Sequence, residues 1–200
     1  MDFAVVDYGA SNMFSLISAL KKLDINVNII SSPQKLVNFS AVILPGVGNF
    51  SSAISVVEKI KEDIIASAGN GVPLLGICLG LQLMCEKSEE GPGEGLNIFE
   101  GQVVKFSKNV KIPHMGWNTV LPKNNSILLD GIEERLWVYF AHSYYPKPKD
   151  NSVIKGTTGY GTGFASVMEE GQAYGTQFHP EKSGDIGKAI LMNFVKCIKR

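Results

Sequence analysis

The chain is organised around the stretch Val72-Pro73-Leu74-Leu75-Gly76-Ile77-Cys78-Leu79-Gly80. Its first six residues are nearly all apolar and predict a buried strand, and the pattern from Leu79 to Lys87 predicts the opening of a helix. Cys78 therefore lies at a strand–turn–helix junction with a glycine two residues to either side. The same layout built with serine is the nucleophile elbow, where glycines permit the sharp turn and close packing of helix on strand.

A thiol at this junction would face the first turn of a helix. Unpaired backbone N–H groups and the positive end of the helix dipole favour the thiolate there, which is the reactive form of cysteine. The alternative is a buried structural cysteine in a tight turn, because free cysteine is often found in the core. This stretch alone leaves both interpretations open.

The composition is that of an ordinary globular protein. The 200 residues balance 19 basic against 19 acidic side chains, so charge predicts neither a nucleic-acid nor a membrane partner. Residues 1–7 are acidic rather than basic, and no signal peptide or membrane span is predicted. Three cysteines without framework spacing indicate a reducing, cytoplasmic setting, and no structural zinc site is predicted.

The first half of the chain alternates short apolar runs with helical patterns, which predicts βαβ units and a parallel sheet. The predicted strands are Phe3 to Val6, Val27 to Ile30, Ala41 to Leu44 and Val72 to Ile77. The predicted helices run from Asn12 to Leu23, briefly from Ser32-Pro33, and from Ser51 to Ala68.

The second half is more strand-like and begins with a charged, glycine-rich surface loop at residues 89–95. Strands are predicted at Gln102 to Phe106, Trp117 to Leu121, Leu136 to Ala141, Val153 to Thr157 and Ala173 to Phe178, and a last helix at Asp185 to Ile198. With no linker or repeat, we expect one domain, residues 1–200.

A base for the cysteine is predicted at His179-Pro180-Glu181. The residue before a proline is held extended, and side chains two apart in an extended chain point to the same side. A carboxylate beside a histidine fixes its tautomer and stabilises the imidazolium, as a general base for a thiol requires. A surface His–Glu pair at a strand end is the alternative, and His142 and His114 are weaker candidates for the base.

Acyl chemistry also needs donors for the oxyanion. One is predicted to be the backbone N–H of Leu79, directly after the nucleophile. The other is assigned to Val47 or Gly48 in Pro45-Gly46-Val47-Gly48, because glycines let successive N–H groups point into one concavity. A tight turn or a phosphate cradle is the alternative for that loop, although it lacks the lysine and spacing of a P-loop.

Together these motifs resemble the triad-type (class I) glutamine amidotransferases. The resemblance is carried by Pro45-Gly46-Val47-Gly48, by Gly76 to Gln82 and by Gln177-Phe178-His179-Pro180-Glu181-Lys182-Ser183. Pro113 to Asn118 and His142 to Tyr145 narrow it to the glutaminase subunits of imidazole glycerol phosphate synthase.

The resemblance implies an α/β, flavodoxin-like fold with a mixed, mainly parallel sheet and helices on both faces. It implies hydrolysis of the glutamine side-chain amide without a metal or cofactor, and delivery of ammonia to a HisF-type (βα)8-barrel cyclase subunit in a heterodimer for histidine biosynthesis. In these roles Cys78 forms the thioester, His179 moves protons and Glu181 orients His179.

The resemblance also assigns residues around the triad. The glutamine-binding residues would be Gly48, Gln82, His142, Ser143 and Tyr144. The residues at or near the partner interface would be Asn12, Trp117, Tyr139 and Lys182.

Some positions depart from the family pattern. Ser11 replaces a glycine, and Ser15 stands where asparagine is common, both on the expected partner face. A related glutaminase that supplies a surface-polysaccharide pathway is therefore an alternative. Another acyl hydrolase and a non-catalytic scaffold are further alternatives, disfavoured by Gln82 and by the intact triad. Cys85 is predicted to be a core residue.

Overall fold

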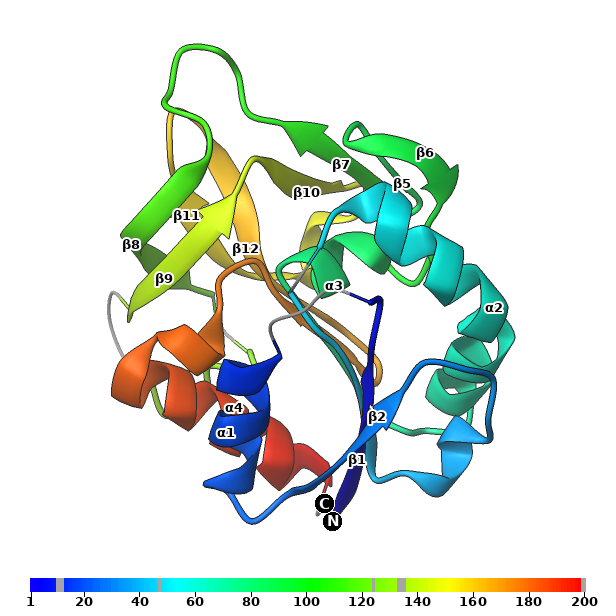
Figure 1. Cartoon of the computed structure of the whole chain (residues 1–200). Helices are drawn as coiled ribbons and strands as arrows, with labels where there is room; N and C mark the ends of the chain where they lie inside the picture. The colour runs from blue at the N-terminus through cyan, green and yellow to red at the C-terminus, as the bar shows by residue number, and fades with distance from the viewer. Residues whose placement is uncertain (10–12, 47, 124, 133–135, 199–200) are drawn as a thin grey trace.

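A computed structural model of the chain describes residues 1–9, 13–46, 48–123, 125–132 and 136–198 (Figure 1). The expectations for Ser11, Asn12 and Val47 therefore lie outside the described residues. The helices are α1 (Phe14–Lys21), α2 (Phe50–Gly69), α3 (Leu79–Leu83) and α4 (Gly184–Ile198), with 3₁₀ turns η1 (Leu36–Asn38), η2 (Asn151–Val153) and η3 (Pro180–Lys182).

Two sheets contain the described strands. The large sheet has the order β2 (Asn26–Ile30), β1 (Asp2–Val6), β3 (Ala41–Leu44), β4 (Leu74–Ile77), β13 (Ala173–Thr176), β12 (Gly163–Glu170), β11 (Ile154–Gly159), β8 (His114–Pro122), β9 (Leu136–His142). Pairing is parallel from β2 to β13 and antiparallel from β13 to β9. The predicted α/β fold with a mixed sheet is confirmed.

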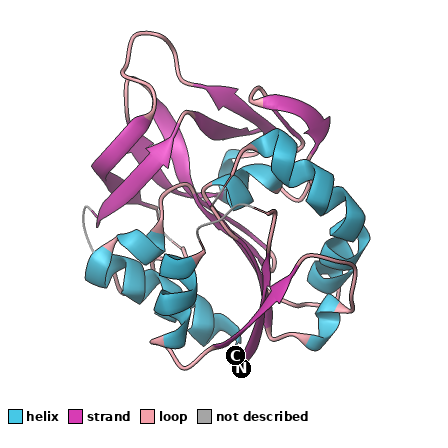
Figure 2. Ribbon diagram, in the orientation of Figure 1, coloured by secondary structure: helices cyan, strands magenta, loops and turns pink. Residues whose placement is uncertain are grey.

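Helices cover both faces of the parallel strands (Figures 1 and 2). Because successive side chains of a strand point to opposite faces, Ala4 and Val6 of β1 join the core under α2, whereas Phe3 and Val5 join the core under α1 and α4. Both faces are apolar, which is why these strands read as continuous hydrophobic runs. Asn49 caps α2 by accepting a hydrogen bond from the Ser52 N–H at 3.0 Å.

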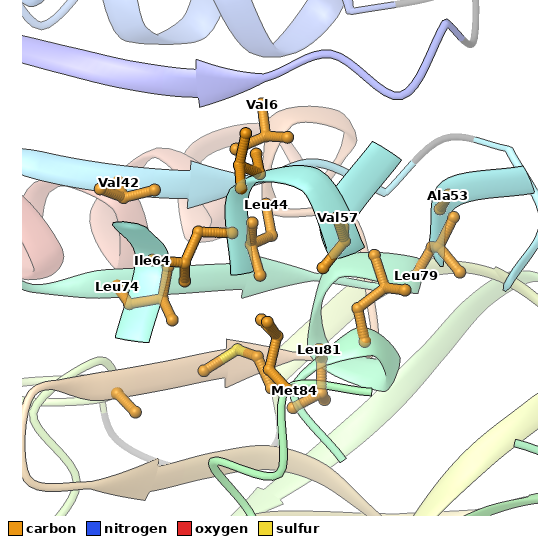
Figure 3. Packing of buried hydrophobic residues seen from close by; sticks show 14 of the residues in the cluster. Val6, Val42, Leu44, Ala53, Val57, Ile64, Leu74, Leu79, Leu81 and Met84 are labelled. Atoms are coloured by element: carbon orange, nitrogen blue, oxygen red, sulfur yellow. The ribbon is translucent and has the colours of Figure 1, made fainter. Parts of the chain in front are cut away.

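The core on the α2 side holds the elbow in place. Figure 3 shows its side chains converging from α2, α3 and the strands: Val6, Val42, Leu44, Ala53, Val57, Ile64, Leu74, Leu79, Leu81 and Met84. Leu81 and Met84 are fully buried. The short helix after Cys78 is thus fixed by its apolar face, because five residues are too few to form a stable helix alone.

The segment at residues 89–95 lies mostly at the surface as predicted, but Gly91–Glu94 form strand β6 of a second sheet where a loop was expected. That sheet has the order β10 (Tyr144–Pro148), β7 (Gly101–Lys105), β5 (Lys87–Ser88), β6 (Gly91–Glu94). The glycines of β6 let its backbone lie directly on α2: a side chain at Gly91 would meet Ser51, and one at Gly93 would meet Ile54. The glycine-rich pattern therefore indicates a surface strand that packs closely on α2, and not an irregular loop.

Two predicted helices end or begin elsewhere. The helix expected to run to Lys87 ends at Leu83, because backbone N–H groups of residues 96–99 bond to the carbonyls of Leu83, Met84 and Cys85 and complete its last turn. The helix expected to start at Ser32-Pro33 is replaced by the turn η1, which begins three residues later. Strands β10 and β12 were not predicted. None of the described helices is long and apolar enough to cross a membrane.

Candidate active site

Cys78 occupies a sharp turn between β4 and α3. Its backbone lies at φ 48° and ψ −102°, in a region that residues other than glycine rarely adopt, and its N–H donates to the Thr176 carbonyl at 2.7 Å. The flanking glycines allow this turn to pack: a side chain at Gly80 would collide with the Leu44 carbonyl, and one at Gly76 would meet the Leu81 N–H. The thiol of Cys78, carried by this strained backbone, therefore lies at the carboxyl end of the parallel strands.

His179 and Glu181 lie beside the cysteine. The Nδ1 atom of His179 is 2.8 Å from Glu181 Oε1, and the two side chains are 4% and 7% exposed. His179 is extended as predicted, but Glu181 lies in the 3₁₀ turn η3 and not in a continued strand. Among the described residues Glu181 Oε2 is buried without a hydrogen-bond partner, so the carboxylate interacts chiefly with the imidazole.

Charge favours a protonated His179. Burial alone would lower its pKa, but the negative charge of the Cys78 sulfur, its hydrogen bond and the Glu181 carboxylate together raise the pKa of His179 to about 10. Gly46 permits the close approach, since a Cβ there would lie 2.8 Å from His179 Cε1 and 2.9 Å from Cys78 Cβ. The arrangement is that of a buried cysteine beside an imidazole that a carboxylate orients.

The backbone segments predicted to donate to the oxyanion line the same pocket as Cys78. Leu79 is the first residue of α3, so its N–H has no acceptor within the helix. Gly48 lies at φ 97°, a conformation that glycine adopts readily, and it lines the same pocket as Leu79 and Cys78. Val47 lies outside the described residues.

A pocket of about 230 Å³ opens at Cys78. It brings together the predicted glutamine-binding residues from separate segments of the chain, namely Gly48, Gln82, His142, Ser143 and Tyr144. Glu90, Pro113 and Met115 also line it and were not predicted. Glu90 was missed because its segment was assigned to a surface loop; its Oε2 accepts a hydrogen bond from the Phe50 N–H at 2.9 Å.

A chain of side-chain hydrogen bonds supports the far wall of this pocket. His142 Nδ1 is 2.7 Å from the Tyr144 carbonyl, His142 Nε2 is 3.0 Å from His114 Nδ1, and His114 Nε2 is 3.1 Å from the Asn118 amide nitrogen. Because a carbonyl can only accept, His142 must donate from Nδ1, and in neutral rings His114 must then donate from Nδ1 as well. The predicted binding residue His142 therefore also fixes the Tyr144 backbone.

Both rings stay neutral in the folded protein, which makes stability fall on acidification. Burial lowers the pKa of His142 to about 3 and that of His114 to about 4. The unfolded chain takes up these protons near pH 6.5, so the stabilisation is present above that pH and is lost as pH falls toward 4. We expect urea denaturation at pH 4.5 to give a free energy of unfolding lower than at pH 7 by about 2 kcal/mol for each histidine.

The His114→Phe variant should lose part of this pH dependence, because phenylalanine takes up no proton. It should still fold, since its ring can stack on Phe140 and Tyr160 as His114 does. Nitrogen NMR at pH 6 should show both rings neutral and protonated at Nδ1. Imidazolium signals assigned to His114 or His142 at that pH would contradict the assignment, whereas His179 is expected to give one.

Three of the predicted interface residues, Trp117, Tyr139 and Lys182, lie near the site, and Asn12 is outside the described residues. Trp117 on β8 is 55% exposed and packs edge-on against Tyr139, its partner in β9, with ring centroids 6.2 Å apart. Lys182 lies exposed in η3 beside the triad. Alternation places exposed Met115 and Trp137 on the same face of this strand pair, which was not predicted.

Comparison with known proteins places these features in a family context. The family model of class I glutamine amidotransferases matches residues 4–197. Similar curated proteins include the HisH subunits of imidazole glycerol phosphate synthase from Archaeoglobus fulgidus (46% identical, covering 98% of this chain and 99% of the relative) and Methanothermobacter thermautotrophicus (41% identical, 98% of each). HisH from Caldanaerobacter subterraneus is 44% identical over 98% of each chain.

Solved structures share the fold at lower identity. A chain from the structure of PurLQS from Thermotoga maritima has a TM-score of 0.79 at 20% identity, covering 98% of both chains. A glutamine amidotransferase from Thermotoga maritima has a TM-score of 0.71 at 17% identity, covering 100% of this chain and 84% of that one.

Proposed function

Because the chain belongs to the class I glutamine amidotransferases, and within them to the HisH subunits of imidazole glycerol phosphate synthase, we propose that Cys78, His179 and Glu181 hydrolyse glutamine for a cyclase subunit. The observation that carries this proposal is the elbow. A strained cysteine at the first turn of a helix lies against a histidine whose other ring nitrogen is held by a buried carboxylate.

The reaction follows from these positions. The Cys78 thiolate attacks the side-chain amide carbon of glutamine, and the oxyanion accepts hydrogen bonds from the Leu79 N–H and from the Val47–Gly48 loop. His179 gives its proton to the leaving nitrogen, so ammonia departs and a thioester remains. His179 then takes a proton from water, whose oxygen attacks the thioester and releases glutamate. Glu181 orients the imidazole and stabilises its charge throughout.

The pocket supplies the positioning. Gly48, Gln82 and the His142–Tyr144 segment would hold the amino-acid end of glutamine, which places its amide at the sulfur. No cofactor is required for this acyl chemistry, and a single glutamine amidotransferase domain of residues 1–200 carries it out.

The ammonia acceptor would be a HisF-type (βα)8-barrel subunit in a cytoplasmic heterodimer. Exposed Trp117 and Lys182, with Tyr139 and Asn12, form the proposed contact, and an exposed apolar face beside an active site is typical of an interaction surface. A polysaccharide-pathway role uses the same chemistry, but the relatives named above favour histidine biosynthesis.

The partner should raise the glutaminase rate. We expect slow glutamate formation by the isolated protein and an increase of about tenfold or more when a HisF-type partner is present together with its nucleotide ligand, because closure of an interface can complete a catalytic arrangement. Coupled assay of glutamate, with and without this partner, measures the increase. The Trp117→Ala variant should need a higher partner concentration to reach the same rate. The control Cys85→Ala should not, because Cys85 is buried in the core and cannot contact a partner.

A rate that the barrel protein leaves unchanged would contradict the proposed partner. Hydrolysis of γ-glutamyl peptides or casein in preference to glutamine would instead identify another acyl hydrolase.

A further inference from the structure

Gln177 is a second side chain in contact with the nucleophile. It is completely buried, and its Nε2 is 3.5 Å from Cys78 Sγ, within hydrogen-bonding range for sulfur. Its backbone is fixed because the Gln177 N–H donates to the Ser166 carbonyl at 2.9 Å. Within the part of the chain that the structure describes, the sulfur also has His179 beside it and the more distant Ala141 carbonyl at 3.8 Å, which can accept but not donate.

The direction of the Gln177 amide is dictated by its neighbours. Gln82 Nε2 lies 2.9 Å from the Tyr144 carbonyl, a pure acceptor, so the NH₂ end of Gln82 must face that carbonyl. The same Nε2 is 3.1 Å from Gln177 Oε1, which accepts its second hydrogen. With its oxygen turned toward Gln82, Gln177 must present its NH₂ group to the sulfur.

We propose that Gln177 donates a hydrogen bond that stabilises the Cys78 thiolate, and that Gln82 is the positioning residue that keeps this donor aimed at the sulfur. The inference rests on the proposed function, since it describes the same nucleophile. It gives Gln82 a role beyond binding glutamine: the Tyr144 carbonyl at the pocket wall orients Gln82, Gln82 orients Gln177, and Gln177 acts on the reacting atom.

The same network of hydrogen bonds also includes His142 and His114. The Tyr144 carbonyl accepts from both Gln82 and His142, so one backbone group joins the wall of the pocket to the donor at the nucleophile. The side chains of this network, Gln82, Gln177, His142 and His114, are buried, whereas Tyr144 is partly exposed. A low-dielectric surrounding strengthens hydrogen bonds between buried groups.

The test is the rate at which iodoacetamide alkylates Cys78 in the full-length protein at pH 7 without glutamine, read from the Cys78 peptide by mass spectrometry. Gln177→Met keeps the length of the side chain and removes the donor. Gln82→Met leaves Gln177 in place and removes only the hydrogen bond that orients its amide. Both should slow alkylation about tenfold, the effect of losing a hydrogen bond to a charged group. The control Gln172→Met removes an exposed amide from the neighbouring turn and should leave the rate unchanged.

Gln177→Glu gives a readout that a loss of packing would not produce. Its carboxylate repels the thiolate at pH 7, but a protonated carboxyl can donate, so its rate relative to Gln177→Met should rise as pH falls. Equal rates of Cys78 alkylation in wild type, Gln177→Met and Gln82→Met would overturn the proposal that Gln177 donates to the sulfur. Absence of alkylation in the wild type would instead overturn the thiolate of the proposed function, so the two failures are distinguishable.

If circular dichroism shows that Gln177→Met does not fold, Gln82→Met decides the outcome. Residue 82 lies farther from the Cys78 sulfur than residue 177, and its substitution leaves the residues in contact with the sulfur unchanged. An unchanged Cys78 rate in this variant overturns the positioning role, and a slow rate without glutamine supports it.

Discussion

Replacing Cys78 with alanine is expected to lower glutamine hydrolysis by the complex by about four orders of magnitude or more while leaving the fold intact. No thioester can form without the sulfur, and losses of this size follow removal of the nucleophile in enzymes that act through acyl intermediates. Alanine suits the site sterically, because the change removes only one atom from a side chain that is 6% exposed. Glutamate formation by the partner-bound protein measures the loss, and circular dichroism checks the fold.

Cys85 provides the matched control for this prediction. It is fully buried, and burial together with the nearby Glu86 raises the pKa of its thiol to about 12, so it cannot serve as nucleophile. Cys85→Ala should keep the wild-type rate. If Cys78→Ala kept a glutaminase rate close to that of the wild type in the presence of the partner, the assigned nucleophile would be wrong.

Replacing Gly80 with alanine is expected to give the largest loss of stability, about 3 kcal/mol. The added Cβ would collide with the carbonyl of Leu44, and backbone in a fully buried strand cannot move aside as a flexible side chain would. The free energy of unfolding from urea denaturation should fall accordingly. Because the collision pushes α3 away from β3, the activity of the remaining folded protein should fall as well.

Gly69→Ala is the control, since a side chain at this position in α2 would meet no atom within 4 Å. Alanine is favoured over glycine in a helix, so this variant should be as stable as wild type or more stable by about 0.5 kcal/mol. Equal stability of Gly80→Ala and wild type would contradict the close packing of the elbow.

Much of the parallel half of the fold could be predicted from residues alone. Strands such as Phe3 to Val6 and Ala41 to Leu44 are buried on both faces and read as short apolar runs, and long helices such as α2 repeat their apolar residues at helical spacing. Of the small second sheet, only β7 could be predicted in this way, as the run Gln102 to Phe106. Strands β5 and β6 are short and largely exposed, and β6 consists of glycine, proline and glutamate, residues that seldom form strands.

The site divides along a similar line. Cys78 and the pair His179–Glu181 stand at local motifs whose geometry follows from strand, turn and proline, so sequence could propose them. Gln177 and His114 act through contacts with residues far along the chain, such as Cys78 and His142. A buried glutamine next to a strand has no local signal that distinguishes a donor to sulfur from an ordinary core amide.

Reaction with a glutamine-derived diazoketone distinguishes the nucleophile from the other cysteines. The reagent binds as glutamine does and alkylates the thiol beside its reactive carbon, with loss of dinitrogen. With the HisF-type partner present, peptide mass spectrometry should find the label on Cys78 and not on Cys85, and excess glutamine should slow the labelling. If the protein hydrolyses glutamine while Cys78 stays unlabelled, the cysteine of this elbow is not the nucleophile.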